Sequence, residues 1–213
     1  MNIKIREPGS TITHFIAWYM SSVASLPLIL KSDDTKTSLA FIIYVTTMIL
    51  LYAVSTIYHS IDINDKVLHI LKKIDHMMVF VHIAGCYTPI CLIVLDGALG
   101  YFLLSLICVV TIIGILVKAF YINSSKWFTA ILYILSGWLC LPMIDKLWNT
   151  LPHAAFGWLF ACGVIYTIGA IVYALKFSFF NSCHKYFDSH AIFHLFIMGG
   201  SSCYFVFVYC YVA

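Results

Sequence analysis

The chain has 213 residues, of which 62% are hydrophobic and only 10% are charged, whereas a soluble globular domain carries about a quarter charged residues. This composition, with a mean hydropathy of +0.97, excludes an ordinary soluble domain and predicts a polytopic membrane protein. The formal net charge of +3 is scattered along the chain, without the basic cluster needed to follow a phosphate backbone, so we expect no nucleic-acid partner.

Seven apolar runs are long enough to cross a bilayer, because a hydrocarbon core about 30 Å thick requires roughly 20 apolar residues per helix. The runs cover residues 13–30, 39–60, 76–95, 99–118, 127–145, 154–176 and 190–212. No Pro/Gly/Ser-rich linker or internal repeat divides the chain. The sequence therefore predicts an all-α membrane protein with a single seven-transmembrane-helix bundle over residues 1–213.

The start of the chain carries Lys4 and Arg6 before the first run, which is also how a signal peptide begins. We expect an uncleaved helix instead, because the run is long and no clear small-residue cleavage site ends it. Residues 61–74 have apolar positions at helical spacing with lysines opposite, and this pattern predicts an interfacial helix before the third span. Pro89 and Pro142 fall inside spans and are candidates for kinks.

The distribution of Lys and Arg predicts the orientation, because positive residues in short loops stay on the cytoplasmic side. The side of the N-terminus has nine, namely Lys4, Arg6, Lys66, Lys72, Lys73, Lys118, Lys126, Lys176 and Lys185. The other side has three, namely Lys31, Lys36 and Lys146. We therefore expect a cytoplasmic N-terminus and an extracytoplasmic C-terminus.

The cysteines lie mostly inside the apolar runs and show no CxxC spacing. They are Cys86, Cys91, Cys108, Cys140, Cys162, Cys183, Cys203 and Cys210. We expect them to pack as small buried hydrophobic residues, with neither a disulfide framework nor a thiolate metal site.

Histidines gather at the cytoplasmic end of this topology. His14 opens the first run, His59 closes the second, and His190 and His194 open the last. The i, i+4 spacing of His190 and His194 places both imidazoles on one helix face, as metal binding from a helix requires. Interfacial histidines that only hydrogen-bond lipid or loop carbonyls share this spacing. With His59 at matching depth, three neutral imidazoles indicate a zinc site with an open fourth position, which is typical of catalytic zinc.

Two further residues lie where they could assist such a site. Ser55 is one helical turn from His59, so its hydroxyl could hold a water, although serine in a membrane helix often bonds the carbonyl four residues earlier. Asp75, at the start of the third run, could accept a proton from that water or cap the helix. His76 is a reserve ligand, and the deeper His82 is expected to be a packing residue.

These residues belong to motifs that resemble those of a known family. The motifs are STIYH at 55–59, Asp75-His76, IAGCYTP at 83–89 and HAIFH at 190–194, with support from REPGSTITH at 6–14, YILSGW at 133–138 and YTIGAIVY at 166–173. Together they are similar to the hemolysin III family, which belongs with the progestin and adipoQ receptors and in turn resembles the alkaline ceramidases. The match runs from end to end, although the family usually has asparagine where this chain has Ser10.

The resemblance implies a seven-helix protein of a bacterial plasma membrane with zinc near the cytoplasmic face. His59, His190 and His194 would be the zinc ligands, and Asp75 and Ser55 would sit around the water at the metal. A zinc-dependent intramembrane hydrolase that cuts an amide or ester bond of a membrane lipid is the function we favour. Two alternatives stay open: a pore-forming, cytolytic protein, and a receptor-like or membrane-homeostasis protein in which zinc is structural. No protein partner is indicated.

Overall fold

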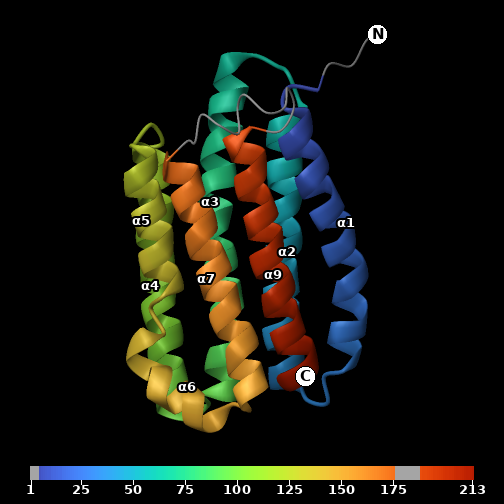
Figure 1. Cartoon of the computed structure of the whole chain (residues 1–213), viewed down its shortest axis with the longest axis vertical. Coiled ribbons are helices and arrows are strands. Elements are labelled where there is room, and N and C mark those ends of the chain that lie inside the picture. Colours follow the sequence, from blue (N-terminus) through green and yellow to red (C-terminus); the bar gives the residue numbers. More distant parts are fainter. Residues whose placement is uncertain (1–4, 176–187) are drawn as a thin grey trace.

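Helices account for almost all of the secondary structure in the computed structural model, which describes residues 5–175 and 188–213. In chain order they are α1 (Pro8–Leu30), α2 (Thr35–Ser60), α3 (Asp65–Pro89), the π-helix η1 (Ile90–Val94), α4 (Gly97–Phe120), α5 (Lys126–Gly137), the 3-10 helix η2 (Leu141–Met143), α6 (Ile144–Thr150), α7 (His153–Leu175) and α9 (Ser189–Tyr211). Figure 1 shows the long helices running side by side along the longest axis, with α6 at the end of the bundle that holds the C-terminus.

Short polar residues fix where several helices begin. The Asp34 side chain accepts hydrogen bonds from the first backbone N–H groups of α2, and Asn64 does the same for α3. Asp188 accepts from the N–H of Ala191 and so begins α9. These are preferred N-cap residues, because their oxygens satisfy N–H groups that have no partner inside the helix.

The structure confirms the all-α prediction: within the described ranges, seven helical segments are long and apolar enough to cross a membrane. They are Pro8–Leu30, Thr35–Ser60, Asp65–Val94, Gly97–Phe120, Lys126–Thr150, His153–Leu175 and Ser189–Tyr211. The orientation in the membrane stays a prediction from the lysine count. Three of the residues behind that count, Lys4, Lys176 and Lys185, lie outside the described residues, as does Cys183.

The prediction of a separate interfacial helix over residues 61–74 is wrong. These residues join the third span in one uninterrupted helix that begins at Asp65 and continues to Pro89. Neither glycine nor proline separates Ile74 from the apolar run that follows, so nothing in the sequence ends the helix there. Asp75 consequently lies well inside α3 and cannot be its N-cap, which is Asn64.

The spans that contain Pro89 and Pro142 are interrupted, as the kink prediction expected. Pro89 ends α3, and the chain continues as the π-helix η1. The span containing Pro142 stops being α-helical after Gly137 and resumes at Ile144. Backbone groups freed at membrane depth need partners, and one phenol supplies them: Tyr87 donates to the carbonyl of Gly137 at 2.7 Å and accepts from the N–H of Cys140 at 3.0 Å.

The bundle brings the two ends of the chain together. Helix α9 packs against both α7 and α1, and α2 packs between α1 and α3. We call the end where α1, α3, α5 and α9 begin, and where α2, α4 and α7 end, the site end (Figure 1). Segments more than a hundred residues apart in sequence therefore meet at the site end.

Replacing Gly100 with alanine should lower the melting temperature of the purified protein. A Cβ at this position would overlap the backbone carbonyl oxygen of Cys91 in η1, so α4 would have to move away from the π-helix. Overpacking of this kind costs about 1–3 kcal/mol. The matched control is Gly157→Ala in α7, where a Cβ meets nothing within 4 Å, and equal melting of the two variants would contradict the prediction.

Candidate metal centre and cavity

Three histidines from two helices meet at the site end. His59 lies one residue before the end of α2, while His190 and His194 lie in the first turns of α9. One ring nitrogen from each lies within 4.8 Å of the others, and the Nε2 atoms of His59 and His190 are 3.4 Å apart. His59 and His194 are fully buried, and His190 is half-buried. The three side chains lie close together in the structure, as predicted.

The spacing of these nitrogens suits one metal ion. Ligand nitrogens that surround a tetrahedral zinc ion at 2.0–2.1 Å lie about 3.3 Å from one another, close to the separation of His59 from His190. Neutral imidazole is a common ligand of zinc and of other first-row transition metals. His59, His190 and His194 could therefore hold such an ion, with a fourth position left for water or substrate.

Glu7 orients His59 from outside the cluster. Its carboxylate lies 2.7 Å from Nδ1 of His59, and its backbone N–H donates to the carbonyl of His59 at 3.1 Å. Burial raises the pKa of the Glu7 carboxyl, but hydrogen bonds to and charges on His59 and Arg6 outweigh burial and hold this pKa below its ordinary value. The carboxylate accepts a hydrogen bond from the Nδ1–H of His59, which leaves Nε2 to face a metal.

His194 is oriented in a similar way by α1. Its Nδ1 lies 3.3 Å from the backbone carbonyl of Ser10 and 3.4 Å from the Thr13 hydroxyl. A carbonyl can only accept, so Nδ1 carries the proton and Nε2 is the ligand atom. Because the contact uses the backbone of Ser10, it does not depend on the side chain at that position.

Replacing Glu7 with alanine should weaken zinc binding about 10- to 100-fold, the usual effect of removing an outer hydrogen-bond partner of a ligand. The reason is that the Nδ1 proton of His59 loses its acceptor and the ring loses its fixed orientation. Competition with a chromophoric chelator measures the affinity. Asp62→Ala, an exposed acidic residue in the turn after α2, is the matched control, and equal affinities in the two variants would show that Glu7 does not support the site.

Asp75 and Ser55 lie together beside the histidines. The fully buried Ser55 side chain lies near the Asp75 carboxyl. Asp75 lines the same hollows as His190. The cap alternative for Asp75 is excluded by its place inside α3, whereas its role as a base stays a prediction.

Two of the histidines in α3, His76 and His82, do not join the cluster. His76, the predicted reserve ligand, has its Nδ1 3.1 Å from the Tyr133 hydroxyl and is not among the three grouped histidines. His82 is buried, with its nitrogens 3.4 Å from the Thr47 hydroxyl and 3.5 Å from Cys86 Sγ. It packs inside the bundle, as predicted.

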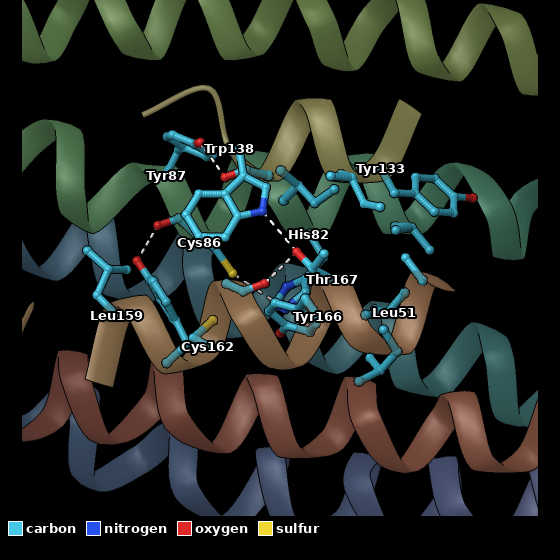
Figure 2. Close-up of a pocket in the computed structure, with 18 of the residues that line it drawn as sticks. Leu51, His82, Cys86, Tyr87, Tyr133, Trp138, Leu159, Cys162, Tyr166 and Thr167 are labelled. Carbon is cyan, nitrogen blue, oxygen red and sulfur yellow. Dashed lines mark hydrogen bonds between the residues drawn. The ribbon is translucent and has the colours of Figure 1, made fainter. Parts of the chain in front are cut away.

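An apolar cavity of about 180 Å³ extends from the histidines into the bundle. At the site end its lining includes Ser55, Asp75 and His190, and at the opposite end it reaches Leu147 and Phe156. Figure 2 shows its middle part, where Leu51, Cys86, Leu159, Cys162 and Tyr166 surround the space and Trp138 Nε1 donates to the Thr167 hydroxyl at 2.9 Å. This space has the shape and chemistry for a hydrocarbon chain.

A second, polar hollow of about 380 Å³ opens at the site end. Its lining shares Asp75, His76, Tyr173 and His190 with the apolar cavity. The rest of the lining is Glu7, Tyr58, His59, Lys72, Ile122, Asn123, Ser124, Lys126, Thr129 and Asp188. The histidine cluster therefore lies between a polar space and an apolar one.

Sequence reasoning did not assign roles to Glu7 and His14. Glu7 belongs to the first motif, and an acidic residue beside an apolar run at the depth of His59 was the available signal. His14 was expected only to open the first span, but α1 begins earlier, at Pro8, and His14 stacks on His194. No pattern in the sequence predicts which face of α1 meets α9.

Comparison with known proteins gives a consistent family. A family model described as haemolysin-III related matches residues 3–205. The chain is 37% identical over 209 residues to a Bacillus cereus protein named Hemolysin-3, covering 97% of this chain and 91% of that protein. It is 35% identical to a Hemolysin-3 homolog of Bacillus subtilis strain 168, covering 96% and 94%. With seven apolar helices and bacterial relatives, the chain is a multi-pass protein of the cell membrane and belongs to the haemolysin-III-related family.

Proposed function

We propose that this protein is a zinc-dependent intramembrane hydrolase that cuts an amide or ester bond of a membrane lipid. One observation carries the proposal: three ligand-type histidines and a carboxyl-hydroxyl pair lie at the head of a cavity suited to an acyl chain. The resemblance of the family to the alkaline ceramidases favours the same class of bond.

Zinc, when bound, supplies a Lewis acid that polarises a carbonyl and makes water a stronger nucleophile near neutral pH. Asp75 takes a proton from the attacking water, and Ser55 lines the cavity beside it. As the water oxygen bonds to the carbonyl carbon, the bond to the leaving amine or alcohol breaks, and Asp75 returns the proton to that group. The products are a fatty acid and the amine or alcohol.

The two hollows suit the two halves of such a substrate. The apolar cavity takes the acyl chain, which enters from the bilayer, and the polar hollow admits water and the polar head of the lipid. On the lysine distribution, we place the site end on the cytoplasmic side of the membrane.

The test is hydrolysis by the purified protein in detergent across a panel of N-acyl and ester lipids. We expect turnover that is lost with a zinc chelator and restored by adding zinc. Turnover that is indifferent to the chelator, or absent across the panel from zinc-loaded protein, would contradict the proposal.

The name of the relatives gives a second candidate, a pore-forming or cytolytic protein. Against it, a conducting pore is lined by polar groups along its length, whereas the described cavity is polar mainly at the site end. Leakage of dye from liposomes is the discriminating measurement. Leakage that persists when all three histidines are replaced by alanine would favour this candidate over hydrolysis.

A further inference from the structure

His14 is a buried histidine outside the metal-ligand group. Its ring stacks on His194, with centroids 3.5 Å apart and planes inclined by 10°, and the Tyr52 ring meets it edge-on at 5.1 Å. Only 4% of the residue is exposed. Two aromatic neighbours therefore hold the ring in one orientation beside the metal centre.

Neither ring nitrogen of His14 has a hydrogen-bond partner among residues 5–175 and 188–213. A neutral imidazole offers one N–H donor and one acceptor lone pair, and buried polar groups in native proteins are nearly always paired. The neighbouring rings are paired: His59 with Glu7 and His194 with Ser10. Within the described residues, His14 therefore lacks the kind of hydrogen-bond partner that His59 and His194 have.

His14 also lines the apolar cavity at its site end, where Ser55, Asp75 and His190 contribute too. A molecule that fills the site end of the cavity therefore has His14 among the residues around it. The lining contains no Lys or Arg in the described part of the chain, so a carboxylate head would find no counter-charge there. A neutral acceptor is the better partner for a buried imidazole N–H.

We propose that His14 forms a hydrogen-bonding subsite for the carbonyl oxygen of an acyl chain bound in the cavity. The N–H of His14 donates to that oxygen and places the carbonyl next to the three-histidine cluster. The inference rests on the proposed function only in taking the ligand to be a lipid, because it concerns binding and requires no bond to be cut.

The test compares two probes that cannot be hydrolysed, 2-heptadecanone, which has a carbonyl, and heptadecane, which does not. Retention of each radiolabelled probe by the purified protein in detergent is measured at equal zinc content. One hydrogen bond corresponds to a preference of about 3- to 10-fold for the ketone. His14→Phe keeps the stacked ring but has no nitrogen, so it should lose the preference while binding heptadecane as before. His14→Gln keeps an N–H donor and should retain part of it.

A surface variant, His69→Phe on the exposed face of α3, controls for the added phenyl ring and should keep the full preference. Equal preference in wild type and His14→Phe, or no preference in wild type, overturns the subsite. If the protein hydrolyses no lipid but His14→Phe loses the preference for the ketone, the subsite is supported and the hydrolase proposal is contradicted. If the protein hydrolyses lipid but His14→Phe keeps the preference, the hydrolase is supported and the subsite is contradicted.

Discussion

Replacing His194 with alanine is expected to cost the purified protein its zinc and its lipid hydrolysis together. The cluster would keep only His59 and His190, and loss of a ligand weakens metal binding more than the 10- to 100-fold typical of an outer partner. Zinc is measured by elemental analysis after gel filtration, and hydrolysis on the lipid that the wild type turns over best. Full zinc occupancy in this variant would contradict the three-histidine centre.

The same variant separates a catalytic metal from a structural one. If zinc only holds α2 and α9 together, His194→Ala should melt at a lower temperature than wild type. Lost zinc with an unchanged melting profile would exclude the purely structural role that the receptor-like alternative requires. His153→Ala is the matched control, because His153 begins α7 at the opposite end and contacts Trp148, and it should keep both zinc and hydrolysis.

Replacing Asp75 with asparagine should lower the rate of hydrolysis about 10²- to 10⁴-fold, the usual contribution of a general base, with zinc retained. Asparagine has nearly the same shape as aspartate, but its amide cannot take a proton from water. The rate is measured at saturating lipid with zinc content determined on the same sample.

Asp65→Asn, an exposed change at the start of the same helix, should leave the rate near that of wild type. A rate for Asp75→Asn within about 10-fold of wild type would show that Asp75 is not the base, since a general base contributes at least about 10². Loss of zinc together with the rate would mean that Asp75 helps to hold the metal.

The histidine cluster could be predicted because its signals are local. The spacing of His190 and His194 fixes them on one helix face, and apolar run lengths set the depth of His59. The structure brings together the three histidines whose positions depend on these two regularities. The same regularities gave the seven spans, since seven long apolar segments leave few other folds for a chain in a bilayer.

The place of Asp75 along its helix could not be predicted in the same way. Its surroundings change from amphipathic to apolar at Ile74, which reads as a boundary in the sequence, yet the backbone runs on because no residue ends the helix. The contacts that α1 makes with other helices could not be predicted either. Whether Glu7 reaches His59, and whether His14 stacks on His194, depends on how α1 rotates against α2 and α9, and packing across fifty or more residues decides that.

The interrupted fifth span has a mechanical consequence for the cavity wall. Leu141 lines the cavity and is also 46% exposed, so a single layer of chain separates the cavity from the bilayer-facing surface there. Moving an intact helix aside would disturb its packing over several turns. Displacing the segment 138–143 requires mainly that Tyr87 release Gly137 and Cys140 and that Trp138 release Thr167. The wall of the apolar cavity is therefore easier to displace at this segment than where an uninterrupted helix lines it.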